Sequence, residues 1–318
     1  MDVIGIDISK ADFHAYLIQG SRNAARSFPN GPSGYRQLWR WLRNRGTTEV
    51  HACMEATGSY WMGLATALFE NGLRVSVVNP SRTAMFARSQ LLRTKTDKVD
   101  AQMIAEFCQT QQPKPWTPPS PQSLELRGLL SYRQQLVRQR IGLKQIANEV
   151  HVGAGLQALH TSHLKSVDDA IDALEAQILA ILKANPELEA QVARLTSIKG
   201  FGLISAVALV AKLPIDRLRD GKAAAAYVGL SPRERQSGTS VRAKPRNCKT
   251  GDAELRRDLY MPAIVAMRYN PTLSAFAARL KERGKPSKVI IVAVMRKLVV
   301  LAYQLLKDPA GPKIAVPA

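Results

Sequence analysis

The sequence has few cysteines, few aromatic residues and no long uninterrupted apolar run. Its three cysteines, Cys53, Cys108 and Cys248, are widely spaced and odd in number, which predicts neither a disulfide framework nor a zinc site. No apolar run reaches the roughly 18 residues that a membrane helix needs. The first residues carry neither the basic nor the apolar segment of a secretory leader. These absences predict a cytoplasmic protein with no membrane partner.

Acidic residues are also scarce, with 25 Asp and Glu against 45 Lys and Arg, so the net charge is +20. Counted along the sequence, residues 1–116 carry +5 (14 basic, 9 acidic), residues 117–196 carry zero (8 and 8), and residues 197–318 carry +15 (23 and 8). A final third this basic predicts a polyanionic partner, and nucleic acid is the commonest one. The alternative is a basic surface that serves only solubility.

The first 116 residues predict an α/β domain. Three consecutive strands are expected, then helices and strands in alternation, an order typical of a mixed sheet with helices on its faces. The expected strands are 3–8, 11–18, 25–28, 50–54 and 74–78, and the expected helices are 32–45, 60–70 and one that contains Asp97 and Asp100. Five prolines within residues 112–121 then predict a linker.

The rest of the chain is predicted to be mainly helical. Residues 117–186 contain the linker and two long helices, 123–152 and 162–184, which predict an antiparallel pair or a coiled-coil arm. Residues 187–318 form a basic C-terminal domain whose last three helices are expected near 251–268, 271–283 and 286–307. The apolar segment Val289–Leu306 is interpreted as a core or subunit-contact helix.

A helix-hairpin-helix motif is predicted where Gly200-Phe201-Gly202 interrupts two helices. Bare glycines would let backbone N–H groups at the start of the second helix approach a phosphate, with Lys199 beside them. Such a motif binds DNA backbones without sequence preference. The alternative is a helix corner that glycine merely closes.

Four carboxylates are candidates for a single metal site. Asp97 and Asp100 lie about one turn apart on one helix face. Asp7 interrupts an otherwise apolar strand, where an unpaired carboxylate is costly, and Glu55 ends the strand 50–54. Acids from two neighbouring strands and one helix could hold one or two Mg²⁺ ions for phosphodiester cleavage. Taken alone, Asp97 and Asp100 are better explained as an acidic first turn that favours the helix dipole.

Five segments resemble the transposases of the insertion sequence "one-ten" family, also called DEDD transposases, which are related to Piv-type DNA invertases. In order they are VIGIDISK (3–10), CMEATGSY (53–60), LRTKTDKVDAQMIAEF (92–107), ISAVALVAKLP (204–214) and AAYVGLSPRERQSGTSVR (225–242). The resemblance covers essentially the whole chain. Thr239 stands where the family commonly has serine, which is a conservative change.

The resemblance implies a RuvC-like, ribonuclease-H-type first domain whose Asp-Glu-Asp-Asp quartet is Asp7, Glu55, Asp97 and Asp100. It also implies a C-terminal transposase domain with Ser237 as nucleophile. Mg²⁺, or Mn²⁺ as a substitute, would be the cofactor. The implied partners are target and donor double-stranded DNA, a structured bridge RNA that guides the protein, and further copies of the chain in a tetramer arranged as a dimer of dimers. The implied location is the bacterial cytoplasm, at the nucleoid.

The segment from Tyr227 to Arg246 is expected to contain no helix and to present arginines around Ser237. A serine hydroxyl needs activation, and no histidine is near in sequence, so a metal at the quartet is the expected activator. Ser240 is the rival nucleophile, and a loop that binds phosphate without covalent chemistry is the alternative to both. The basic residues expected to bind nucleic acid are Arg233, Arg235, Arg242, Lys244, Arg246, Arg256 and Arg257, with Lys199, Gly200 and Gly202.

Other functions make different predictions from the same residues. A RuvC-like, structure-specific endonuclease would use metal-activated water and would not need Ser237, and a Piv-like invertase would need no guide RNA. A non-enzymatic DNA-binding protein would tolerate loss of Glu55 or Asp97. An actin-like sugar kinase could begin with VIGIDIS, but the later glycine-rich nucleotide-binding motifs of that fold are not found.

Overall fold

A computed structural model describes residues 1–58, 60–91, 96–149, 153–237, 241–248 and 250–308, without the side chains of 147–149, 154, 234–237 and 241–246. The chain divides into two compact units, Met1–Pro119 and Ser120–Ala318. The first boundary lies three residues after the expected end of the N-terminal domain at residue 116. The expected arm and the basic C-terminal part share the second unit, and their division into separate domains at residue 186 stays a prediction.

The first unit is built on a five-stranded mixed sheet in the order β3-β2-β1-β4-β5. Its strands are β1 (Asp2–Ile8), β2 (Asp12–Ile18), β3 (Ala24–Pro29), β4 (Val50–Glu55) and β5 (Arg74–Val78). β1 pairs antiparallel with β2 and parallel with β4, so Asp7 and Glu55 both lie at the carboxyl ends of adjacent strands. The mixed sheet predicted from the sequence is confirmed.

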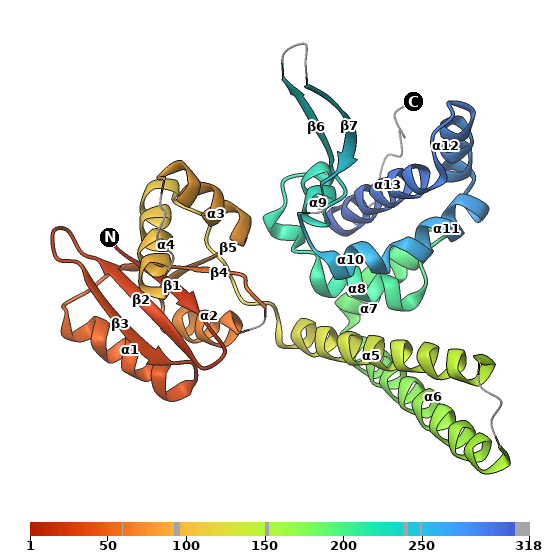
Figure 1. Ribbon diagram of the computed structural model, residues 1–318, viewed down its shortest axis with the longest axis horizontal. Helices are drawn as coiled ribbons and strands as arrows, with labels where there is room; N and C mark the ends of the chain where they lie inside the picture. Colours follow the sequence, from red (N-terminus) through yellow and green to blue (C-terminus); the bar gives the residue numbers. More distant parts are fainter. Residues whose placement is uncertain (59, 92–95, 150–152, 238–240, 249, 309–318) are drawn as a thin grey trace. The chain divides into compact units, whose positions relative to one another are not determined.

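Helices cover both faces of this sheet (Figure 1). α1 (Pro32–Asn44) and α2 (Trp61–Glu70) pack on one face, and α3 (Pro80–Ser89) and α4 (Asp97–Gln111) on the other. α4 crosses β1 at Gly5, where an added Cβ would lie 2.2 Å from both the Ala101 oxygen and the Ala105 nitrogen. Glycine in the strand therefore allows the close approach that brings the start of α4 near Asp7.

Two features of this unit were not predicted. α3 is not among the elements expected from the sequence. Asn79 follows the strand β5 and also caps this helix, since its side chain accepts from the Ser81 N–H at 2.8 Å, and Pro80 is the first residue of the helix. Two cysteines that are far apart in sequence also meet: Cys53 of β4 and Cys108 of α4 are both fully buried and share a side-chain hydrogen bond, which with burial raises the pKa of the Cys53 thiol. Both are free thiols.

The second unit begins with two long helices, α5 (Pro121–Glu149) and α6 (Ala154–Lys183), which run side by side in opposite directions (Figure 1). Arg133 pairs with Glu175 at 2.6 Å and Arg140 with Asp168 at 3.2 Å. Between them Leu136, Val167, Ile171 and Leu174 form an apolar cluster. The antiparallel pair is confirmed, and coiled-coil packing within it stays a prediction.

The remaining elements form a helical body with one hairpin (Figure 1). They are α7 (Pro186–Thr196), α8 (Leu203–Lys212), the 3-10 turn η1 (Ile215–Arg217), α9 (Gly221–Tyr227), β6 (Pro232–Ser237), β7 (Val241–Asn247), α10 (Ala253–Asp258), α11 (Tyr260–Tyr269), α12 (Pro271–Glu282) and α13 (Ser287–Lys307). The helix expected over 251–268 is two helices, α10 and α11, which meet at Leu259.

α13 corrects the expectation about apolar length, because its 21 residues are long and apolar enough to cross a membrane. Seven of its residues are buried in the core of the second unit, among them Ile290, Val294 and Leu298. Packing against α9, α11 and α12 accounts for this apolar character, as the core helix of a folded unit has the same composition. The interpretation of Val289–Leu306 as a core helix is therefore confirmed.

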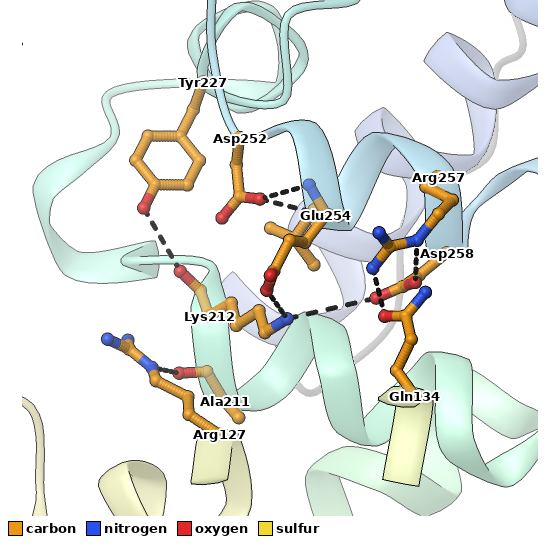
Figure 2. A network of polar contacts seen from close by, with 10 residues as sticks. Arg127, Gln134, Ala211, Lys212, Tyr227, Asp252, Glu254, Arg257 and Asp258 are labelled. Atoms are coloured by element: carbon orange, nitrogen blue, oxygen red, sulfur yellow. Dashed lines mark hydrogen bonds and ion pairs between the residues drawn. The ribbon is translucent and has the colours of Figure 1, made fainter. Parts of the chain in front are cut away.

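A polar network joins α5, α8 and α10 in the second unit (Figure 2). Lys212, the last residue of α8, is only 8% exposed, and its Nζ lies 2.8 Å from Glu254 Oε2 and 4.0 Å from Asp258 Oδ2. Arg127 Nε donates to the Ala211 carbonyl at 2.7 Å, and Arg257 donates to Gln134. These bonds fix the C-terminal end of α8 against its neighbours.

Candidate active site

Asp7 and Glu55 face α4 from the same edge of the sheet. Side chains alternate along a strand, so Asp7 shares a face with Gly5, and Glu55 shares a face with Cys53. Gly5 contacts α4 directly, and Cys53 packs in the cluster that contains Ile104 and Cys108 of α4. The register between β1 and β4 pairs Ile6 with Met54, which places Asp7 and Glu55 one step further along adjacent strands. Both side chains are half-buried.

Asp97 and Asp100 lie in the first turn of α4. Thr96 caps this helix, since its hydroxyl oxygen accepts from the Val99 N–H at 3.3 Å. Carboxylates are favourable at this end of a helix because they face the positive pole of its dipole. Asp97 is 71% exposed and Asp100 is half-buried.

The pKa of Asp7 depends on the three other acids. Burial, and then the charges of Asp100, Glu55 and Asp97 in that order of size, together raise the pKa of Asp7 to about 6. His14 acts in the opposite direction. A carboxyl group so placed carries an uncompensated repulsion, which a divalent cation would remove. The quartet expected from two strands and one helix is thus brought to one place, and its metal-binding role stays a prediction.

Two further residues at this site were not found from the sequence. His14 of β2 is paired with Asp7 in the strand register, and its Nε2 lies 3.5 Å from Asp97 Oδ2. Thr83 of α3 is fully buried, and its hydroxyl donates to Glu55 Oε1 at 2.5 Å. His14 could have been found from the alternation of β2, whereas Thr83 could not, because α3 itself was missed.

The donor set suits a hard divalent cation, because it consists of carboxylate oxygens around Asp7, which is half-buried and repelled by the charges of the three other acids. Among the residues that the structure describes, no three His, Cys, Asp or Glu side chains are already at metal-ligand spacing. The carboxylates would have to draw together around an ion. The chemistry and charge of these residues therefore suit a divalent cation, and its identity as Mg²⁺ or Mn²⁺ stays a prediction.

The predicted nucleophile lies in the second unit. Ser237 is the last residue of β6, where its backbone pairs with Val241 of β7. Its side chain, those of Arg235, Arg242, Lys244 and Arg246, and the whole of residues 238–240, including the rival Ser240, lie outside the described part of the chain. The expectation that 227–246 contains no helix holds beyond Tyr227 for the described backbone, which forms a hairpin that projects from the helical body (Figure 1).

The glycines of the predicted helix-hairpin-helix have structural explanations of their own. Gly200 has φ +129°, and an added Cβ would lie 2.7 Å from Cβ of Ala266 on α11, so glycine is needed there for packing. Gly202 precedes α8, and its N–H donates to Ser205 Oγ at 3.1 Å. Lys199 beside them is exposed. α7 and α8 do flank the turn, but phosphate binding by it stays a prediction.

Among the predicted nucleic-acid-binding arginines, Arg233 is exposed at the base of the hairpin. Arg256 is half-buried and donates to the Val228 carbonyl at 3.0 Å, which supports the segment leading into β6. Arg257 is exposed and contacts Gln134 and Asp258. Arg256 and Arg257 therefore have internal partners, and their contacts with nucleic acid stay a prediction.

Comparison with known proteins agrees with this arrangement. Residues 4–150 match the DEDD transposase family named after IS110, whose description is simply a transposase, and residues 192–278 match the transposase IS116/IS110/IS902 family. The pilin gene-inverting proteins of Moraxella bovis and Moraxella lacunata are each 32% identical over 310 residues, covering 96% of this chain and 95% of theirs.

Among solved structures, Thermus thermophilus RuvC in complex with a Holliday junction substrate is 14% identical with a TM-score of 0.27, covering 36% of this chain and 99% of that one. That score is too low to support an argument about function. The sequence relatives, in contrast, extend along nearly the whole chain. The chain therefore belongs to the IS110 family of transposases, a family of DNA recombination enzymes, as its sequence motifs predicted.

Proposed function

We propose that this protein cuts and rejoins DNA through a serine–DNA intermediate, with Asp7, Glu55, Asp97 and Asp100 holding Mg²⁺ or Mn²⁺. The observation that carries the proposal is the convergence of the three other acids on Asp7, which burial and their charges hold at a pKa of about 6. Like charges are gathered in this way where a cation neutralises them. A bound ion would stabilise charge on the reacting phosphate and its oxygens.

Ser237 is the nucleophile in this proposal. Its Oγ attacks the DNA phosphorus and loses its proton, the bond from phosphorus to the 3′ oxygen breaks, and the 3′ end leaves as a hydroxyl. The product is a 5′-phosphoserine that conserves the phosphodiester energy, so the strand can be rejoined to another 3′ hydroxyl without ATP. The arginines of the hairpin, such as Arg235 and Arg242, would hold the non-bridging phosphate oxygens.

A denaturing gel with end-labelled DNA tests this chemistry. The wild-type chain and Ser240→Ala should form a covalent adduct, and Ser237→Ala should form none. An adduct that persists in Ser237→Ala but is lost in Ser240→Ala would assign the nucleophile to Ser240. Cleavage that continues in Ser237→Ala without an adduct would favour the metal-activated water of an endonuclease.

Guidance by a bridge RNA and assembly as a tetramer are part of the proposal, and the family resemblance supports both. The full-length similarity to pilin gene-inverting proteins favours a second candidate, a DNA invertase that needs no guide. Sequencing the nucleic acid that copurifies with the protein separates the two. A single structured RNA species supports guidance, and its absence favours the invertase.

A further inference from the structure

The first unit has a groove of about 690 Å³ between α1 and α2. Its lining combines apolar and aromatic side chains with exposed basic ones, which form its rim. The lining residues that matter here are Tyr35, Arg36, Trp39, Arg40, Arg43 and Leu68. A smaller hollow of about 290 Å³ adjoins it, since the two share Trp39, Arg43 and Asn71.

Three arginines follow one another along the rim. Arg36, Arg40 and Arg43 stand at positions i, i+4 and i+7 of α1, a spacing that places them on one face over about 10 Å of helix. All three are exposed, and no Asp or Glu is among the residues that line the groove. The adjoining hollow contains one acid, Glu49, together with Arg74. The groove therefore favours a ligand with several negative charges.

Two aromatic residues, Tyr35 and Trp39, line the same groove as these arginines. Trp39 is half-buried and lines both hollows. Tyr35 is held in place because its hydroxyl donates to Asn30 Oδ1 at 2.9 Å, and Gly63 leaves room for that hydroxyl. Fixed rings beside guanidinium groups can stack on planar bases while the arginines hold phosphates.

The groove lies on the opposite face of the sheet from the four acids. α1 and α2 pack on the face whose core includes Leu38 and Leu64, whereas α4 packs on the face that includes Cys53 and Ile104. A strand bound in the groove is therefore separated from the reacting phosphate by the thickness of the sheet. The groove is a candidate for holding nucleic acid that is not being cut.

We propose that this groove binds a single-stranded segment of nucleic acid, with a base stacked on Trp39 and phosphates held by Arg36, Arg40 and Arg43. Single strands fit better than duplex because only unpaired bases present a face for stacking. A second copy of this chain is a poor occupant, since it also carries a net charge of +20. The proposal rests on the family's action on DNA and is independent of the metal and of Ser237.

Fluorescence anisotropy of the full-length protein with labelled 12-mers tests the site, using oligo-dT, oligo-U and a mixed-sequence duplex in EDTA, where cleavage cannot interfere. Arg36→Gln/Arg40→Gln should weaken binding of a single strand and reduce the slope of log affinity against log salt by about 1.4, because each lost phosphate contact contributes about 0.7. The control Arg22→Gln/Lys222→Gln removes the same charge at exposed positions outside the groove. It should leave the slope unchanged.

The aromatic part of the site is tested with Trp39→Leu and Trp39→Phe. Trp39→Leu should weaken single-strand binding about fivefold or more with an unchanged salt slope, whereas Trp39→Phe should retain most of the affinity. Circular dichroism of both variants shows whether the unit folds. Stronger loss with oligo-U than with oligo-dT would identify RNA as the natural source, and the reverse would identify DNA. Equal effects of the groove and control variants, or losses confined to duplex, would overturn the proposal.

Discussion

Thr83 donates its hydroxyl hydrogen to Glu55 Oε1 over 2.5 Å. The same hydroxyl lies 2.9 Å from the Pro80 carbonyl, but it has only one hydrogen to donate, and the contact with Glu55 is the shorter of the two. Thr83 is fully buried on α3. It therefore fixes the orientation of a carboxylate that we assign to the metal.

Thr83→Val keeps the shape of the side chain and removes the donor. Supporting residues of this kind typically change metal affinity by about 10- to 100-fold, so the Mn²⁺ concentration for half-maximal binding, followed by electron paramagnetic resonance, should rise within that range. Thr83→Ser should restore most of the affinity. Thr110→Val, at an exposed helical threonine of the same unit, is the control. Unchanged Mn²⁺ binding in Thr83→Val would remove Thr83 from the site.

Asp7 makes the metal-free protein sensitive to pH. Its folded-state pKa of about 6 is above the ordinary carboxyl value, so the folded state holds an extra proton between about pH 4 and pH 6. Stability is therefore lost as the pH rises through this window. Asp7→Asn should be more stable than the wild type in EDTA at pH 8, by about 1 kcal/mol once solvent screening is allowed for.

Urea denaturation at pH 4.5 and pH 8 measures this difference, with the exposed Glu49→Gln as control. The advantage of Asp7→Asn should shrink at pH 4.5, and Mg²⁺ should stabilise the wild type more than the variant. Equal stability of the two proteins at pH 8 would contradict the charge cluster.

Lys212 is the centre of the polar network in the second unit (Figure 2). Its hydrogen bond holds the pKa of Glu254 below its usual range, so this contribution to stability is present near neutral pH and is lost as the pH falls through the lowered pKa. Lys212→Met removes the buried cation that lies beside both Glu254 and the half-buried Asp258, and leaves Asp258 with its 3.5 Å contact to Arg257, which should cost about 3 kcal/mol. Scanning calorimetry should show a transition roughly 6–12 °C lower, and the exposed Lys222→Met should show almost none.

The four acids and Ser237 lie in different units of the chain. One active site could therefore combine the acids of one subunit with Ser237 of another. Mixing a Ser237→Ala protomer with an Asp97→Ala protomer should then restore strand transfer to a fraction of the wild-type rate, because some mixed assemblies contain one intact site. Each protein alone should remain inactive. No activity in the mixture, with hetero-oligomers shown to form, would place both groups in one subunit.

The pattern of apolar residues predicted every strand of the five-stranded sheet, because these strands are short runs that are either apolar and buried, as in β1, or alternately buried, as in β2. The same pattern did not predict α3, because a proline after a strand is compatible both with a loop and with the first residue of a helix, as Pro80 is here. It also failed where tertiary contacts decide, as with Cys53 and Cys108, whose proximity depends on how α4 crosses β4. For α13, basic residues interrupt the apolar sequence. Only the hydropathy averaged along the helix shows that it is apolar enough to cross a membrane.

The candidate site was partly predictable for the same reasons. Asp7 could be found from the sequence because it is an acid within an apolar strand. Asp97 and Asp100 could be found because they are one helical turn apart. His14 is one of several polar residues on β2, and only its pairing with Asp7 in the strand register places it at the candidate site. Trp39 could not be assigned to the groove from the sequence, because helical spacing cannot distinguish a buried ring from one at the edge of a groove.

Identifying the serine that becomes attached to DNA is the most direct test of the proposed serine–DNA intermediate. The covalent adduct formed with DNA can be trimmed with nuclease, digested with trypsin and sequenced by mass spectrometry, since cleavage after Arg235 and Arg242 releases a peptide of seven residues, 236–242. If Ser237 is the nucleophile and the four acids hold the metal, a nucleotide remnant is expected on Ser237. It should form only with divalent metal and should be absent from Asp7→Asn. A remnant on Ser240, or DNA cleavage with no modified peptide, would contradict this expectation.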